Sequence, residues 1–295
     1  MAWLRLLRIA ALPSALSNIL LGYLLANGSW SPSVPLALLL ISSACLYCSG
    51  MILNDVFDFE VDKTQRPNSP LPAGDISINA AALVGLVLML GGTIIAALAS
   101  SFSLYVAAAL AVAVFLYDGP LKRTPLAPIL MGLCRTTNIL LGASTAATIP
   151  PVVWCYAGAI GIFVAGITWL ARRESEKTQS LTQLTPGSIS MVSGILLIVY
   201  VSWKFASLGD SPHIPQVLPL AIAFISLPIL RRLAVAWSTA SGAAVQATVI
   251  TSLRSLIIFD AAMSLLVENG RPVFSIAILC LLGVSWILGR SIRIT

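Results

Sequence analysis

Four acidic residues fall within the eight positions from Asp55 to Asp62. On a continuous helix, spacings of three and four residues place Asp55, Asp58 and Asp62 on one face. Asn54 joins this face four residues before Asp58. Like charges at this spacing repel each other, so a positive group must compensate them. Carboxylate and amide oxygens suit Mg²⁺, which commonly bridges one or two carboxylates to substrate phosphates. The segment therefore predicts a Mg²⁺ site for a phosphate-bearing substrate.

A plainer interpretation of this segment is an acidic patch at the membrane surface, neutralised by Lys63 and Arg66. A solvated patch needs no helical register and no Asn54 at its head, so we favour the metal site. Glu60 points away from the shared face and is not a predicted ligand. Arg66 begins a loop rich in proline, residues 66–74, which ends the helix and can fold Arg66 back over the acids.

The composition shows which elements must carry this site. Of the 295 residues, 58% are apolar and 9% are charged, and the mean hydropathy is +0.96. An ordinary soluble domain has about 25% charged residues, so this chain cannot form the charged surface that a soluble domain needs. We predict a single integral membrane domain, residues 1–295, whose chemistry falls to helix ends and loops. Basic loops at the membrane explain the net charge of +6, and no nucleic-acid binding is predicted.

Apolar stretches separated by glycine, proline and charged residues predict an all-α polytopic membrane bundle, with nine to ten transmembrane helices around a central cavity. Nine spans remain possible because Arg254 lies in the middle of residues 243–267. The first part of this stretch would then lie at the membrane interface. The ten predicted spans are residues 10–27, 34–53, 78–99, 102–117, 127–147, 151–170, 188–206, 215–230, 248–267 and 272–289.

Lysine and arginine are distributed unevenly between the predicted loops. Residues 54–77, 118–126 and 171–187 are basic loops, whereas the opposite side has only Lys204 and Arg271. Cytoplasmic loops collect Lys and Arg. We therefore predict a multi-pass protein of the cell inner (cytoplasmic) membrane, whose active-site loops face the cytoplasm.

The acidic segment and its surroundings resemble a known family. Residues 54–62 read NDxxDxxxD, and Arg66-Pro67 and then Leu-Pro-Ala-Gly at 71–74 follow. This order is similar to the signature of the UbiA superfamily of intramembrane prenyltransferases. Tyr117 with Leu-Lys-Arg at 121–123 resembles that family's Tyr…Lys-Arg element. The stretch at 131–138 is similar to the EboC-like branch of the superfamily.

The resemblance implies a reaction. An isoprenyl diphosphate binds with its tail among the helices, and Mg²⁺ and basic side chains hold its diphosphate. Membrane lipids surround the helices. A lipophilic acceptor, aromatic or lipid-like, then takes the prenyl group within the membrane. The leaving diphosphate carries about three negative charges, which metal and basic clamps stabilise as they develop. The basic clamps would be Arg66, Lys122 and Arg123.

The superfamily carries a second acidic motif, usually Asp-x-x-x-Asp, after its sixth span. Here Glu174 stands at the first acidic position and Thr178 at the second. Glu176 is acidic, but a spacing of two residues puts it on another side of a helix. Either Glu174 binds a second Mg²⁺ weakly, or Arg172 or Arg173 supplies the positive charge instead. The same gap leaves an alternative function open: a catalytically weakened membrane component that binds or carries an isoprenoid-linked metabolite.

Charged and polar residues inside the predicted spans are further candidates. Arg135 and Asn138 lie three residues apart on the fifth span, and a charge inside a membrane is a functional candidate by default. We predict Arg135 near the diphosphate, the alternative being an ion pair with Asp118. Asp260 either lines the acceptor pocket or pairs with Arg254.

The predicted sites form three groups. The catalytic residues are Asp55, Asp58 and Lys122. The Mg²⁺ ligands are Asp55, Asp58, Asp62 and Glu174. The substrate-binding residues are Asn54, Arg66, Tyr117, Arg123, Arg135, Asn138 and Arg173.

Overall fold

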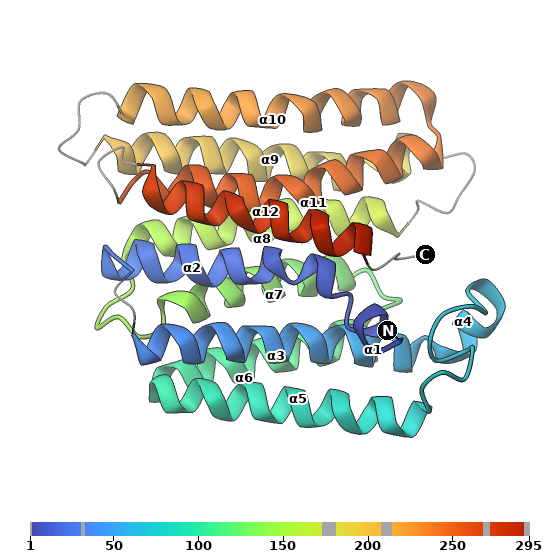
Figure 1. Cartoon of the computed structure of the whole chain (residues 1–295). Helices are drawn as coiled ribbons and strands as arrows, with labels where there is room; N and C mark the ends of the chain where they lie inside the picture. Colours follow the sequence, from blue (N-terminus) through green and yellow to red (C-terminus); the bar gives the residue numbers. More distant parts are fainter. Residues whose placement is uncertain (1, 31–32, 173–180, 208–213, 268–271, 292–295) are drawn as a thin grey trace.

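The fold consists of helices that run side by side, as a computed structural model of the chain shows (Figure 1). The structure describes residues 2–30, 33–172, 181–207, 214–267 and 272–291. Its helices are α1 (Ala2–Leu6), the 3₁₀ helix η1 (Ile9–Ala11), α2 (Pro13–Asn27), α3 (Val34–Phe57), α4 (Phe59–Gln65), α5 (Ile78–Ala99), α6 (Ser101–Asp118), α7 (Ala127–Ala143), α8 (Pro151–Ala171), α9 (Leu181–Ala206), α10 (Ile214–Thr239), α11 (Gly242–Ser264) and α12 (Val273–Ser291).

Nine helical segments within the described ranges are long and apolar enough to cross a membrane, and α7, with 17 residues, is shorter. Each of the ten predicted spans coincides with one of these ten segments, which confirms the all-α polytopic fold. The helix α11 runs without a break through Arg254. The chain is therefore not divided at this arginine, and the tenth helix of the prediction is present.

Two helices are longer than the hydropathy pattern predicted. The helix α9 begins at Leu181 and includes Pro186, and α10 continues to Thr239 past Arg231 and Arg232. Hydropathy marks only the apolar part of a helix, whereas the helix itself continues through polar residues in α9 and through basic residues in α10. Long basic side chains can extend along the helix surface towards water while their stems stay on apolar surface.

The helix α2 has the most central position in the bundle. It contacts α3, α7, α8, α11 and α12. Of the apolar stretch within Ile9–Asn27, 67% is buried. By contrast, only 22% of the apolar stretch of α5 and 11% of that of α12 are buried. These two helices therefore present apolar side chains to the surroundings. Apolar outer surfaces of this kind suit contact with lipid tails.

Small residues let α2 and α7 approach closely. A Cβ atom at Gly22 would lie less than 3.0 Å from the carbonyl oxygen of Ile139, and one at Gly142 would lie 2.9 Å from Ile19 Cα. Membrane helices commonly pack through such small residues, because close backbones gain dispersion contacts that lipid cannot replace. This contact fixes the face of α7 that meets α2.

Candidate active site

The acidic segment lies where α3 ends and α4 begins. The helix does not continue through residues 54–62 as predicted, because α3 ends at Phe57 and Asp58 separates it from α4. Backbone hydrogen bonds still join the two pieces, from Asp58 N to Asn54 O (3.0 Å) and from Asp62 N to Asp58 O (2.8 Å). The expectation of one uninterrupted acidic face is therefore wrong.

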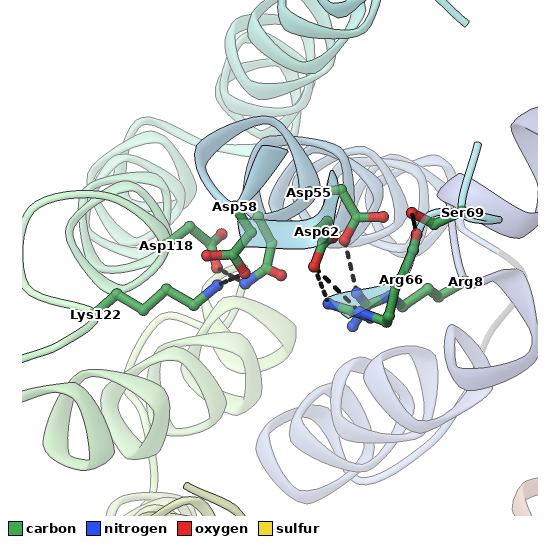
Figure 2. A network of polar contacts seen from close by, with 9 residues as sticks. Arg8, Asp55, Asp58, Asp62, Arg66, Ser69, Asp118 and Lys122 are labelled. Carbon is green, nitrogen blue, oxygen red and sulfur yellow. Dashed lines mark hydrogen bonds and ion pairs between the residues drawn. The ribbon is translucent and has the colours of Figure 1, made fainter. Parts of the chain in front are cut away.

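The acids divide into two groups, which Figure 2 shows side by side. In one group, buried Asp55 accepts from Arg8 Nη2 at 2.7 Å, and buried Asp62 accepts from Arg66 Nη2 at 2.9 Å. Arg66 thus folds back over the acidic segment, as the proline-rich loop predicted. Arg8 reaches Asp55 from 47 positions earlier in the chain, whereas Arg66 lies one helical turn after Asp62.

The second group joins the ends of α3 and α6 (Figure 2). Lys122 forms an ion pair with Asp58, and Asn54 Nδ2 donates to Asp118 Oδ1 at 2.9 Å. A pocket of about 190 Å³ opens here. Its lining combines acidic, basic and apolar side chains: Phe57, Asp58, Asp118, Gly119, Pro120, Lys122 and Arg123.

Two residues of this site, Arg8 and Asp118, were not assigned to it from the sequence. Arg8 lies 47 positions before Asp55, in front of the first span, and its backbone adopts a left-handed conformation with φ of 45°. Tyr47 donates to the Arg8 carbonyl at 3.2 Å. Asp118 was considered only as a partner for Arg135. An arginine beside the first apolar stretch, on the side of the acidic loop, was the available signal for Arg8.

The loop after α6 and the end of α8 meet at this end of the bundle. Arg172 donates to the carbonyls of Thr124 (2.9 Å) and Arg123 (3.2 Å). Tyr117 is half-buried one residue before Asp118, and the Arg123 side chain is exposed at the pocket. The predicted ligands Arg173 and Glu174, with Thr178, lie outside the described residues. The three predicted loops thus converge at one end as far as the structure describes them.

Two polar residues of α7, Arg135 and Asn138, bond α2 rather than the acidic segment. Arg135 donates to the Ser14 carbonyl and to the Ser14 hydroxyl, both at 3.1 Å. It also donates to Asn18 Oδ1 at 3.3 Å. Asn138 donates to the Ala15 carbonyl at 2.9 Å. Arg135 forms no ion pair with Asp118 or with any other described acid. The substrate-binding roles of Arg135 and Asn138 stay predictions.

Asp260 is the acceptor of a buried cluster that joins α2, α8 and α11. Its carboxylate accepts from Ser17 (2.6 Å), Asn18 (2.8 Å) and Tyr156 (2.7 Å). It does not pair with Arg254, so that alternative is wrong. Asn18 also accepts from Arg135, which links the two polar clusters of the interior.

The donor set fits Mg²⁺ only in part. Its carboxylate and amide oxygens have the right chemistry, but among the described residues no three acidic, histidine or cysteine side chains gather to hold a metal by themselves. Mg²⁺ often keeps waters and binds one or two carboxylates together with substrate phosphates. The residues therefore fit a Mg²⁺ ion that arrives with a diphosphate, with Asn54, Asp55, Asp58 and Asp62 as the candidates to hold it.

The sequence profile of the UbiA prenyltransferase family matches residues 15–253. The chain belongs to this family. Its similarity to the digeranylgeranylglyceryl phosphate synthase of Methanoculleus marisnigri is 41% identity over 106 residues, 36% of this chain and 37% of that protein. The synthase of the same name from Methanopyrus kandleri is 27% identical over 89% of this chain and 99% of its own length. The first of these alignments thus spans little more than a third of the relative.

Solved structures support the fold of this UbiA family member. A UbiA homologue from Archaeoglobus fulgidus bound to DMAPP and Mg²⁺ superposes with a TM-score of 0.66 at 17% identity, covering 91% of this chain and 99% of that one. The same homologue bound to GPP and Mg²⁺ gives 0.63 at 16% identity, with coverage of 91% and 100%. The family predicted from residues 54–74 is confirmed, whereas the EboC-like branch stays a prediction.

Proposed function

We propose that this chain transfers a prenyl group from an isoprenyl diphosphate to a lipophilic acceptor inside the membrane, with Mg²⁺ as cofactor. The main support is the gathering of buried acids and basic side chains at one end of an apolar bundle. Asp55, Asp58 and Asp62 each hold a different cation there. Mixed charge of this kind suits a metal–diphosphate pair, because the metal can bind the acids while the phosphate oxygens bind the bases.

The chain's own residues would act mainly on the leaving diphosphate. Lys122, Arg66 and Arg8 already lie at the acids, and short side-chain movements would turn them towards phosphate oxygens. Mg²⁺, when bound, neutralises charge on the leaving group. Asn54 and the aspartates would hold that ion. The C–O bond of the donor then breaks with less cost, because positive groups stand where negative charge develops.

The apolar helices would provide the rest of the reaction conditions. The prenyl tail would lie among them, and the allylic cation would be shielded from water until the acceptor attacks. The name of the archaeal relatives, a synthase of digeranylgeranylglyceryl phosphate, favours a lipid acceptor over an aromatic one. We place the site at the cytoplasmic face of the cell inner membrane, because the loops at 54–77 and 118–126 carry the basic residues.

Product formation by the purified full-length protein tests this function. Protein in nanodiscs is mixed with Mg²⁺, extracted membrane lipids and geranyl, farnesyl or geranylgeranyl diphosphate, and prenylated lipids are detected by mass spectrometry. Asp58→Asn should lower product formation about 100-fold or more. Glu60→Gln is the matched control, since Glu60 belongs to the same segment but its side chain is 79% exposed and pairs only with Lys63.

The outcomes separate the two candidate functions. Product from the wild type and from Glu60→Gln, but not from Asp58→Asn, supports the transferase. Donor binding without any product would favour the alternative, a weakened component that binds or carries an isoprenoid-linked metabolite. Equal product from all three proteins would contradict the role given to the acidic segment.

A further inference from the structure

Asp118 differs from the other carboxylates of the site in forming no ion pair with any described residue. Asp118 is 3% exposed and is the last residue of α6, beside the pocket. Its Oδ1 accepts one hydrogen bond, from the neutral amide of Asn54 at 2.9 Å. Within the described ranges it forms no ion pair, and its Oδ2 accepts no hydrogen bond. One neutral donor compensates the charge of a carboxylate less well than the cations that pair with Asp55, Asp58 and Asp62.

The position of Asp118 brings a carboxylate from α6 to the acidic end of α3. A Cβ atom at Gly50 would lie 3.5 Å from Asp118 Oδ2, so the carboxylate lies close to the backbone of α3. Asn54, one helical turn further along α3, holds the other oxygen. Figure 2 shows Asp118 and Asp58 next to each other, with the Lys122 side chain reaching towards them. Both carboxylates line the same pocket of about 190 Å³.

We infer that Asp118 is a ligand of the divalent cation that binds with the donor diphosphate, and that it shares this ion with Asp58. This inference rests on the proposed function. Two carboxylates from different helices match the one or two that Mg²⁺ takes when phosphate oxygens and waters complete its shell. The ion compensates the charge of Asp118 and takes the place of Lys122 on Asp58. Lys122 then becomes available to the phosphate oxygens.

The assignment also bears on the incomplete second acidic motif. Position 118 belongs to neither acidic motif of the family resemblance, and Thr178 stands where the second motif usually has an acid. A carboxylate on α6 supplies an additional anionic ligand to the same end of the bundle. If Asp118 were only a hydrogen-bond acceptor for Asn54, an asparagine at 118 would serve as well, because its side-chain oxygen can accept the same bond.

Binding of Mn²⁺ in place of Mg²⁺ tests the inference without an activity assay. Purified full-length protein with inorganic pyrophosphate is titrated with Mn²⁺, and free Mn²⁺ is measured by electron paramagnetic resonance. Asp118→Asn should weaken Mn²⁺ binding about tenfold or more, since even indirect partners of metal ligands cost 10–100-fold. Asp75→Asn is the control, because it removes the same charge from an exposed position in the loop that follows α4.

The results are easy to tell apart. Mn²⁺ affinity of Asp118→Asn within about twofold of Asp75→Asn would overturn the inference and leave the proposed function standing. Absence of pyrophosphate-dependent Mn²⁺ binding in the wild type would overturn both.

A second measurement needs no variant at position 118. Fe²⁺ replaces Mn²⁺ on the wild-type protein with pyrophosphate, and ascorbate with hydrogen peroxide cleaves the backbone close to the bound metal. Mass spectrometry should find cuts near residue 118 as well as within 55–62. Cuts confined to 55–62 would show that the ion does not reach α6 and would overturn the inference, even if Asp118→Asn fails to fold.

Discussion

The contact between α2 and α7 gives the most quantitative prediction of the structure. Gly22→Ala would place a Cβ atom less than 3.0 Å from the carbonyl oxygen of Ile139, whereas ordinary contacts begin at 3.4 Å. The two helices must therefore move apart by more than 0.4 Å, which is the difference between 3.4 and 3.0 Å. A shift of this size would lengthen the bond from Arg135 to the Ser14 carbonyl, now 3.1 Å, to the limit of hydrogen bonding.

The free energy follows from three contributions. Overpacking a close contact costs about 1–3 kcal/mol, and a weakened interhelical hydrogen bond costs about 0.6 kcal/mol in membrane proteins. Alanine gains about 1 kcal/mol over glycine inside a helix. Gly22→Ala should therefore destabilise the protein by about 0.5–2.5 kcal/mol. Gly158→Ala, on α8, meets no atom within 4 Å and should stabilise it by up to about 1 kcal/mol.

Reversible unfolding in mixed micelles, followed by tryptophan fluorescence during an SDS titration, measures both free energies. The two alanine variants should differ by about 1.5–3.5 kcal/mol in the free energy of unfolding. If Gly22→Ala and Gly158→Ala unfold at the same SDS fraction, the close approach of α2 and α7 is incorrect, and so is the position that it gives to Arg135.

Three further predictions concern other parts of the bundle. Asp260→Ala should lower the free energy of unfolding by about 2 kcal/mol, because three donors lose their acceptor at about 0.6 kcal/mol each, and Tyr156→Phe should cost about a third of that; equal losses would contradict this sharing. Lys122→Met should slow prenyl transfer about 100-fold in a single-turnover assay, and an unchanged rate would exclude Lys122 as a diphosphate clamp. Cysteines placed at Ser69 and Thr124 in a cysteine-free background should escape a membrane-impermeant thiol reagent in intact cells; labelling of either would contradict the cytoplasmic assignment.

The helices and the acidic segment could be predicted from the sequence because both leave local signals. Apolar stretches about one bilayer long mark spans by composition alone, and the acids between Asp55 and Asp62 are adjacent in the chain. The contact of Arg66 with Asp62 is also local, because the two residues lie four positions apart. In each case the residues that decide the structure lie within one or two helical turns of each other.

Long-range contacts account for what the sequence did not reveal. Arg8 and Asp55 are 47 residues apart, and Asn54 and Asp118 are 64 apart, so no spacing rule joins them. Helical periodicity alone also does not indicate the break at Asp58. The direction of Arg135 depends on Gly22, which brings α2 against α7.

Donor binding is the most direct test of the central claim, that the acidic segment holds a metal with a diphosphate. Isothermal titration of the purified full-length protein with farnesyl thiodiphosphate, a slow-reacting donor analogue, is performed with Mg²⁺ and with EDTA. The wild type and Glu60→Ala should bind the analogue with Mg²⁺ and lose binding in EDTA, while Asp58→Ala should not bind it in either condition. Mg²⁺-dependent binding retained by Asp58→Ala, or wild-type binding that EDTA leaves unchanged, would contradict the account.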